Sequence, residues 1–367
     1  MALSFTGNEK GILPDRMISA LAADGAIAPK RPFAPDQIQP ASLDLRLGSV
    51  AYRVRASFLP GRTTVAQRIA DLKLHEFSLA EGAVLETGCV YIVPLQESLA
   101  LPGDVAAAAN PKSSTGRLDV FTRVIADETR GFDRIEAGYK GPLYAEISPR
   151  TFPVLVREGS RLSQIRFRHG HAQLTADELR DLHARERLVD DAKADVSEGV
   201  LFSVDLSGLG PGGLVGYRAK RHTGLIDVER RDGYGVLDFW EPIQARPEKS
   251  LILDPNEFYI LASKEAVQVP PGYAAEMVPF DPLVGEFRVH YAGFFDPGFG
   301  YAGAGGQGSR AVLEVRSREV PFILEHGQTV GRLVYEKLLA KPDTLYGTGI
   351  GSNYQAQSLK LSKHFKA

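Results

Sequence analysis

The sequence is almost without cysteine and has no long hydrophobic run. Cys89 is the single cysteine among 367 residues, which excludes a disulfide within the chain and a zinc site of the Cys-x-x-Cys type. No apolar stretch approaches the ~18 residues that a membrane-spanning helix needs, and the first residues lack the apolar core of a signal peptide. We therefore expect a cytoplasmic protein without zinc or membrane association, in which Cys89 is a buried strand residue.

Neither sign of charge dominates the chain. Lys and Arg number 43 against 45 Asp and Glu, which leaves a formal net charge of −2 and argues against a nucleic acid polymer as partner. A local phosphate site remains compatible with this balance. Hydrophobic residues make up 44% and charged residues 24%, so wholesale disorder is excluded. The 37 glycines and 23 prolines exceed their average share and indicate many turns.

A shift of 168 residues brings much of the sequence into register with itself. Comparison of residues 97–170 with residues 265–338 pairs identical residues at prolines, glycines and charged positions. The pairs include Glu97 and Glu265, Pro102 and Pro270, Pro111 and Pro279, Glu146 and Glu314, Arg150 and Arg318, Pro153 and Pro321, and Gly159 and Gly327. We infer two copies of one domain, at residues 1–190 and 200–367, with a linker made of a helix near residues 175–190 and the polar stretch 190–198.

Both copies carry the pattern of short β-strands. Residues 143–148 and 312–317 alternate apolar and polar side chains, as half-buried strands do. Strands of this kind, separated by proline and glycine turns, predict a sandwich, jelly roll or barrel. The sequence therefore indicates a mainly β fold in each copy.

Helices are expected to be few and short. Pro14 begins one that Gly25 ends, because proline suits the first turn of a helix and glycine the position after the last. Thr175 and Glu178 have the spacing of a capping box, which predicts a second helix near residues 175–190.

The segment Asn-Pro-Lys-Ser-Ser-Thr-Gly-Arg at residues 110–117 concentrates polar groups after an apolar strand. Backbone N–H groups at such a turn, together with hydroxyls and a forked guanidinium, suit phosphate oxygens. On composition alone, a solvated polar turn is the simpler interpretation. The candidate phosphate-binding residues are Lys112, Ser113, Ser114, Gly116 and Arg117.

Two pairs of carboxylates lie within apolar strands. Glu146 and Glu314 recur at the same place in both copies, although an isolated glutamate on a strand ordinarily faces solvent. Asp44 and Asp205 have similar neighbours at a slightly different shift, and a strand-end or capping role is the simpler interpretation. The chain lacks Walker, Rossmann and Gly-x-Ser-x-Gly patterns, and it lacks the signature of zinc-dependent nucleobase deaminases.

Over nearly its whole length the chain resembles the dCTP deaminase branch of the dUTPase-like superfamily, in a long, duplicated form. Residues 42–48 resemble the family's early strand, and residues 112–117 resemble its phosphate loop. Lys112 stands where the family usually has arginine, which keeps the charge but loses the fork. Residues 290–299 resemble the segment that ends in Asp-Pro-Gly and an aromatic residue, and residues 312–317 resemble the strand of the catalytic glutamate.

The two halves differ within this resemblance. The second half has Asp281-Pro282 where the first has Ser113-Ser114, and a carboxylate there repels phosphate. The first half has Glu-Ala-Gly at residues 136–138 where the family has Asp-Pro-Gly. The resemblance therefore implies a composite site, with the phosphate loop from one repeat and the base pocket from another, in the same chain or in a partner.

The resemblance implies a fold of tandem dUTPase-like domains, each a distorted jelly roll or barrel. It also implies zinc-independent hydrolytic deamination of dCTP to dUTP and ammonia, in the supply of dTTP precursors. A glutamate would take a proton from the water that attacks C4, with Glu314 as the first candidate and Glu146 as the second. The implied substrate-binding residues are Lys112, Ser113, Ser114, Gly116, Arg117, His290, Tyr291, Ala292, Asp296, Tyr346 and Gln357.

The tail from Tyr346 to Gln357 resembles the family's nucleotide-closing tail, although Asn353 replaces the usual lysine. Mg²⁺ is expected as a cofactor held mainly by the triphosphate. The resemblance also implies a homo-oligomer with sites between domains, and dTTP as an inhibitor.

Two other functions stay open at this stage. The same scaffold supports dUTP diphosphatase activity, alone or combined with deamination, since the Asp44 strand and the loop at residues 113–117 occur with both activities. A non-catalytic nucleotide sensor is the alternative from another class, because Lys112 and Asn353 depart from the family pattern.

Overall fold

The computed structural model describes residues 9–191, 194–210, 212–279, 287–290, 293–304, 308–347, 349–350 and 359–366. The chain divides into two compact units. Unit 1 is built from the chain up to Ala172, together with Gly224–Arg231 and Leu338–Asp343. Unit 2 comprises Gln173–Thr223, Asp232–Lys337 and Thr344–Ala367.

Helix α4 (Ala176–Glu186) belongs to unit 2, which differs from the boundary near residue 190 expected from the sequence. Its apolar residues Leu179 and Leu182 are buried in the core of unit 2. The backbone N–H of Leu174 donates to Tyr335 O at 3.0 Å, which fixes the entry to the helix. The division at Ala172 therefore follows the burial of the apolar face of α4 rather than the polar stretch after it.

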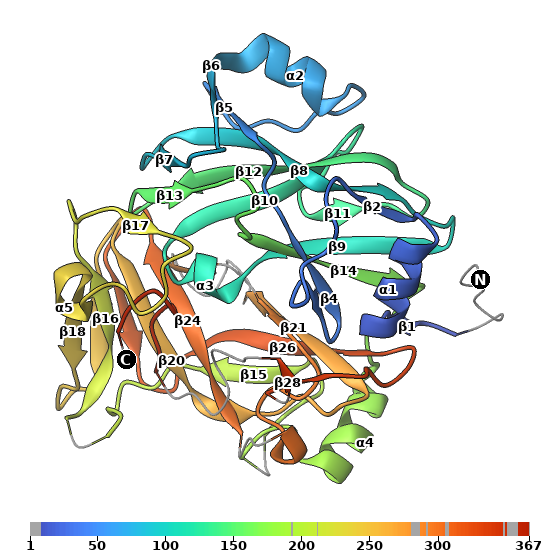
Figure 1. Ribbon diagram of the computed structural model, residues 1–367. Helices are drawn as coiled ribbons and strands as arrows, with labels where there is room; N and C mark the ends of the chain where they lie inside the picture. Colours follow the sequence, from blue (N-terminus) through green and yellow to red (C-terminus); the bar gives the residue numbers. More distant parts are fainter. Residues whose placement is uncertain are drawn as a thin grey trace. The chain divides into compact units, whose positions relative to one another are not determined.

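Unit 1 consists mainly of antiparallel strands (Figure 1). One sheet has the order β11-β9-β14-β4-β3, with β1 on β14; a second has the order β10-β12-β8-β5-β6, with β2 on β8; and a small third has the order β17-β13-β7. The strands are β1 (Gly11–Ile12), β2 (Ile27–Pro29), β3 (Ile38–Gln39), β4 (Ser42–Leu45), β5 (Val50–Val54), β6 (Lys73–Ser78), β7 (Ala83–Leu85), β8 (Val90–Ala100), β9 (Val105–Pro111), β10 (Val120–Ala126), β11 (Arg134–Ile135), β12 (Lys140–Pro149), β13 (Val154–Val156), β14 (Ser163–His169) and β17 (Ile226–Asp227).

Unit 2 repeats this arrangement with fewer strands. Its sheets have the orders β15-β26-β21-β23 and β18-β16-β20-β24-β22, with the pairs β19-β25 and β27-β28 beside them. The strands are β15 (Val200–Ser203), β16 (Leu214–Ala219), β18 (Trp240–Gln244), β19 (Ser250–Leu253), β20 (Phe258–Val267), β21 (Tyr273–Pro279), β22 (Phe287–His290), β23 (Phe294–Phe295), β24 (Ser309–Ser317), β25 (Phe322–Glu325), β26 (Thr329–Lys337), β27 (Leu345–Tyr346) and β28 (Gly349–Ile350); a 3₁₀ turn, η2, spans Ala302–Ala304.

The α-helices of the described residues are short. The two helices that the sequence predicted, near residues 14–25 and 175–190, are confirmed. Helix α1 (Asp15–Ala23) begins after Pro14, and Gly25 follows it with φ of 77°, a left-handed conformation that glycine adopts without strain. In α4, the Glu178 N–H donates to the Thr175 hydroxyl, and a Glu178 carboxylate oxygen accepts from the Thr175 N–H at 2.8 Å. The others are α2 (Val65–Leu72), α3 (Ser113–Gly116) and α5 (Val236–Phe239).

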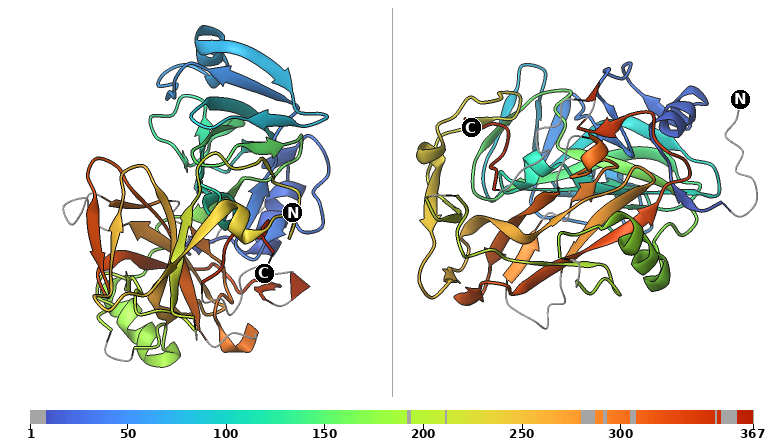
Figure 2. Two further views of the ribbon diagram at one scale, coloured as in Figure 1. Left: turned by 90° about the vertical axis from the view of Figure 1, so that its left-hand side faces the viewer. Right: turned by 90° about the horizontal axis from the view of Figure 1, so that it is seen from below.

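Helix α2 lies in the connection between β5 and the edge strand β6, where Figures 1 and 2 show it at the end of unit 1 in blue. Thr64 and Gln67 form a second capping box that begins this helix, and Asp127 Oδ1 accepts from the N–H of Val65 at 2.7 Å. The apolar face of α2 contributes Val65 and Ile69 to a small buried cluster.

The two units share strand register as well as strand order, which confirms the internal repeat. Ile92 on β8 lies opposite Glu146 on β12, and Ile260 on β20 lies opposite Glu314 on β24. A shift of 168 residues takes Ile92 to Ile260 and Glu146 to Glu314, so the same backbone pairing occurs in both units. The mainly β, duplicated fold expected from the sequence is therefore confirmed.

The register also shows that Asp44 and Asp205 are not equivalent, contrary to the similarity of their neighbours in sequence. Asp44 on β4 lies opposite Gln164, and the position 168 residues beyond Gln164 is Arg332. Arg332 lies opposite Leu201, so Leu201 occupies in unit 2 the place that Asp44 occupies in unit 1. Only unit 1 has a carboxylate at this position.

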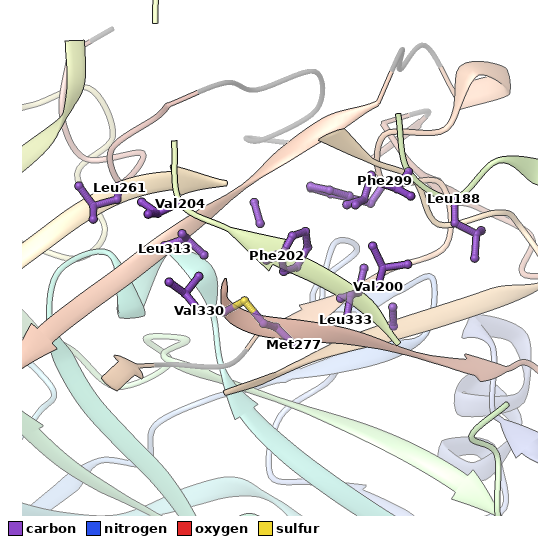
Figure 3. Close-up of a cluster of buried hydrophobic side chains, with 14 of the residues drawn as sticks. Leu188, Val200, Phe202, Val204, Leu261, Met277, Phe299, Leu313, Val330 and Leu333 are labelled. Carbon is purple, nitrogen blue, oxygen red and sulfur yellow. The ribbon is translucent and has the colours of Figure 1, made fainter. Parts of the chain in front are cut away.

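The core of unit 2 lies between its two larger sheets. Figure 3 shows Phe202 and Met277 from one sheet beside Leu261 and Leu313 from the other. Burial of such side chains is the main stabilising contribution to a β sandwich. Cys89 is an exception to our expectations: it lies just before β8, after the turn at Gly88, and is half-buried rather than a buried strand residue.

Candidate functional site

The loop at residues 112–117 is a single helical turn at the end of strand β9. The N–H groups of Thr115 and Gly116 donate to Lys112 O at 2.8 and 3.0 Å, and the N–H of Arg117 donates to Ser113 O at 3.1 Å. These three donors are therefore used within the turn and do not face a ligand. Ser114 and Arg117 have buried side chains, whereas Ser113 and Lys112 are partly exposed.

Lys112 forms an ion pair with the buried carboxylate of Asp44. Its ammonium binds Asp44 Oδ2, and the Arg161 guanidinium lies 3.6 Å from the same oxygen. Arg161 also binds Asp36 Oδ1 at 3.0 Å. The partner oxygen, Asp44 Oδ1, is buried and accepts no hydrogen bond from any residue that the structure describes. Two cations and two carboxylates thus neutralise one another beside the loop.

Arg161 and the carboxylates beside the loop shift one another's pKa values. Burial raises the pKa of Asp36, but the hydrogen bond and the charge of Arg161 outweigh it and hold that pKa below its usual value. Burial lowers the pKa of Arg161, and the carboxylates of Asp36 and Asp44 raise it beyond its usual value. Asp36 and Arg161 therefore both carry their charge at neutral pH.

Glu146 is buried in the middle of β12 and is bound by Arg123 from the neighbouring strand β10. Arg123 Nη2 and Nε donate to Glu146 Oε1 at 2.5 and 3.1 Å. The second oxygen, Oε2, has no contact with solvent and accepts no hydrogen bond among the described residues. Sequence analysis missed Arg123, because the residue opposite a strand position depends on register.

Glu314 is buried at the equivalent position of β24. His290 on β22 lies opposite it, in the place that Arg123 takes opposite Glu146. The structure thus places Glu314 and His290, two residues named from the sequence, at one point of the sheet in unit 2.

Asp296 and Tyr346 also come close together in unit 2. Asp296 begins the turn after β23, where the N–H of Phe299 donates to its carbonyl at 3.1 Å. The N–H of Tyr346 donates to Pro297 O at 2.8 Å, and the Tyr346 ring lies 5.9 Å from the ring of Phe299. The first residue of the expected tail is therefore anchored on the turn of Asp296.

Several of the residues expected from the sequence lie outside the described part of the chain. These are Tyr291, Ala292, Asn353 and Gln357, as well as Asp281 and Pro282. Within the described residues, no group of three or more His, Cys, Asp or Glu side chains is arranged to hold a metal ion. None of the helices among those residues is long and apolar enough to cross a membrane.

Both halves of the chain match models of a known family. Residues 9–171 match the N-terminal domain of 2'-deoxycytidine 5'-triphosphate deaminase, and residues 175–365 match its C-terminal domain. Together with the repeated β units, these matches define an enzyme of the hydrolytic deaminase class. The chain belongs to the 2'-deoxycytidine 5'-triphosphate deaminase family.

Individual relatives agree with this assignment. The crystal structure of 2'-deoxycytidine 5'-triphosphate deaminase from Agrobacterium tumefaciens is 65% identical, covers 94% of this chain and 100% of its own, and superimposes with a TM-score of 0.90. The dUMP-forming dCTP deaminase of Acidothermus cellulolyticus is 33% identical over 156 residues, which are 42% of this chain and 78% of the relative. The dCTP deaminase of Natronomonas pharaonis is 31% identical over 160 residues, 42% of this chain and 79% of the relative.

Proposed function

We propose that this protein catalyses the zinc-independent hydrolysis of dCTP to dUTP and ammonia, as a source of dTTP precursors. Family membership and the 65% identical dCTP deaminase support the substrate. The observation that carries the chemistry is Glu314, a carboxylate buried at mid-strand in unit 2. Burial does not by itself assign the role, because Glu146 is buried as well; proton transfer is the role that the resemblance gives to Glu314.

In this mechanism Glu314 takes a proton from a water molecule, and the resulting hydroxide oxygen forms a bond to C4 of the cytosine ring. As the oxygen adds, the C4–N3 double bond opens and N3 takes the proton from Glu314. Glu314 then moves the proton of the new C4 hydroxyl to the exocyclic nitrogen, the bond from C4 to that nitrogen breaks, and ammonia leaves while C4 becomes a carbonyl. Asp296 would bind the sugar hydroxyl or fix the turn below it. Tyr346, anchored on that turn, would begin the segment that covers the nucleotide.

In unit 1, the side chains of Lys112, Ser113, Ser114 and Arg117 would bind the triphosphate, and Gly116, whose N–H is used within the turn, would leave room for it beside the loop. The partly exposed Lys112 and Ser113 are the side chains of the loop best placed to meet an incoming anion. Because Lys112 is bound to Asp44, it would have to exchange a carboxylate for a phosphate oxygen. After this exchange Asp44 would keep Arg161 as its cationic partner.

Mg²⁺ would arrive on the triphosphate and neutralise part of its charge. Asp44 and Asp36 lie beside the loop, but Lys112 and Arg161 already bind their carboxylates. We therefore expect the triphosphate, rather than these two carboxylates, to supply the ligands of Mg²⁺. Homo-oligomer formation, inhibition by dTTP and a cytoplasmic location stay predictions from the sequence.

A second candidate is a bifunctional reaction that ends in dUMP. The names of several relatives, among them the dUMP-forming dCTP deaminase of Beutenbergia cavernae, favour it; that relative is 32% identical over 158 residues, 42% of this chain and 78% of its own length. A dUTP diphosphatase without deamination and a non-catalytic sensor are the remaining alternatives.

Product analysis tests these functions together. The protein is incubated with dCTP and Mg²⁺, and dCTP, dUTP, dUMP and ammonia are resolved by chromatography and an ammonia assay. We expect dUTP and ammonia in equal amounts; dUMP with ammonia identifies the bifunctional reaction. If dCTP survives, deamination is wrong, and hydrolysis of dUTP then separates the diphosphatase from the sensor.

The Glu314→Gln variant tests the proposed base. It should lower kcat about 10²- to 10⁴-fold, the usual contribution of a general base. Glu319→Gln, an exposed residue just after the same strand, is the matched control and should keep wild-type activity. An unchanged kcat in Glu314→Gln would exclude Glu314 as the base.

A further inference from the structure

The repeat gives the chain two buried glutamates at one position of the fold, Glu146 in unit 1 and Glu314 in unit 2. We infer that Glu146 is not a second general base but the buried counter-ion of Arg123, so that each chain supplies one catalytic carboxylate. The inference rests on the proposed deamination for Glu314. For Glu146 it rests on contacts within unit 1 alone.

The first observation is the exchange of the residue opposite the glutamate. Strands β10 and β22 occupy the same edge of their sheets, beside β12 and β24. Arg123 lies opposite Glu146, whereas His290 lies opposite Glu314. A guanidinium stays charged under all ordinary conditions and has no acceptor, whereas an imidazole can give or take a proton near neutral pH. The two copies therefore place different residue types opposite the same glutamate in register.

The second observation is how firmly Arg123 is held against Glu146. Besides its two bonds to Glu146 Oε1, Arg123 Nη2 donates to Ser57 Oγ at 3.0 Å. Its guanidinium carbon lies 3.3 Å from the centre of the Phe132 ring and 4.6 Å from that of Phe121. Contacts with aromatic rings stabilise a cation and restrict its movement. Arg123 is thus held by Glu146, Ser57 and two aromatic rings of unit 1, and does not need a substrate to order it.

The third observation concerns access of water to Glu146. A general base must reach the water whose proton it removes. Oε1 already accepts two hydrogen bonds from the guanidinium of Arg123, so the ion pair occupies this oxygen. Oε2 is shielded from solvent. Neither oxygen of Glu146 is therefore suited to activate water, whereas the contacts of Oε1 are those of a structural ion pair.

Unfolding and activity measurements on Arg123→Met, Glu146→Gln and the double variant test this inference. Because removal of one partner leaves a buried charge without compensation, each single variant should lower the thermal unfolding midpoint by about 5–10 °C. The double variant, which removes both charges, should lose less than the sum of the two. Activity per folded molecule should stay within a few-fold of wild type in all three. The exposed pair of Lys73 and Glu76 on the same sheet supplies the control Glu76→Gln, which should change neither property.

Two results would overturn the inference. One is a Glu146→Gln variant that unfolds like wild type but loses kcat to the same degree as Glu314→Gln. The other is additive unfolding effects in Arg123→Met and Glu146→Gln, which would show that the two side chains do not act as a pair. A wild-type protein that releases no ammonia from dCTP refutes the proposed function instead, and the unfolding cycle then still decides whether Glu146 is a structural counter-ion.

Discussion

Lys112 at the start of the loop at residues 112–117 is bound to Asp44 on strand β4, so this candidate phosphate ligand is already paired within unit 1. Arg161 shares the same carboxylate oxygen at 3.6 Å. The pair orients the lysine before any anion is present. It also means that the loop does not present an uncompensated charge to solvent, since Asp44 competes with phosphate for the ammonium.

Replacement of Lys112 by methionine should raise KM for dCTP about 10- to 100-fold, the effect of one lost charge-assisted hydrogen bond. kcat should change much less, because Lys112 does not take part in the attack at C4. Arg161 remains to neutralise Asp44, so the variant should fold. Steady-state kinetics give both constants, and Lys341→Met, an exposed lysine of unit 1, serves as control. An unchanged KM would show that Lys112 does not bind the triphosphate.

Unit 2 should lose stability in acid through Asp205. Burial raises the pKa of Asp205, but hydrogen bonds from Ser207 and the guanidinium of Arg310 outweigh it and hold the pKa below its ordinary value of 3.8. A carboxyl with a lowered folded pKa stabilises the fold above the unfolded pKa and loses that contribution as pH falls through the folded pKa.

The wild-type free energy of unfolding should therefore fall below about pH 4, more steeply than that of Asp205→Asn. Urea unfolding at several pH values between 7 and 2 measures both slopes. Equal slopes in the two proteins would show that Asp205 contributes nothing to acid sensitivity.

At alkaline pH the side chain of Tyr139 should behave differently from an exposed tyrosine. Burial raises the pKa of Tyr139 from 10.0 to about 12, and its hydroxyl donates to Pro142 O at 2.7 Å. Because the folded pKa lies above the unfolded one, the stabilisation from the neutral phenol is complete below pH 10 and is lost between about pH 10 and 12. Tyr139→Phe should flatten this loss. Urea unfolding across the range checks it, and identical pH profiles would contradict the assignment.

The C-terminal segment should be needed for the stability of unit 2. The ring of Phe365 lies 5.5 Å from Phe239 and 5.8 Å from Trp240, and its side chain is buried. Phe365→Ala should lower the free energy of unfolding by about 3–5 kcal/mol, as large-to-small substitutions in cores do. The exposed Leu237 gives the control Leu237→Ala. Denaturant unfolding measures both, and equal stability would show that the segment is only loosely attached.

The sequence predicted those features that depend on local pattern. Helices α1 and α4 follow from Pro14, Gly25, Thr175 and Glu178, because caps act within a few residues of a helix end. The repeat, with Glu146 and Glu314 on corresponding strands, follows from a single shift of 168 residues.

The features that the sequence could not provide depend on strand register. Asp205 resembles Asp44 in its neighbours, but cross-strand pairing puts Leu201 in the place of Asp44. Arg123 could not be recognised as the partner of Glu146, because the two are 23 residues apart and meet only when β10 and β12 pair. A one-residue change of register would have turned the arginine to the other face.

The composition of unit 1 from separate stretches of chain has a consequence for its synthesis. Strand β17, from Gly224–Arg231, pairs with β13, and the N–H of Leu339 donates to Ile12 O at 2.9 Å. Residues through Asp343 must therefore be synthesised before the first unit has all its segments. A chain that ends after Ala172 would lack these segments. Truncation at the boundary between the two repeats therefore does not yield a complete unit 1.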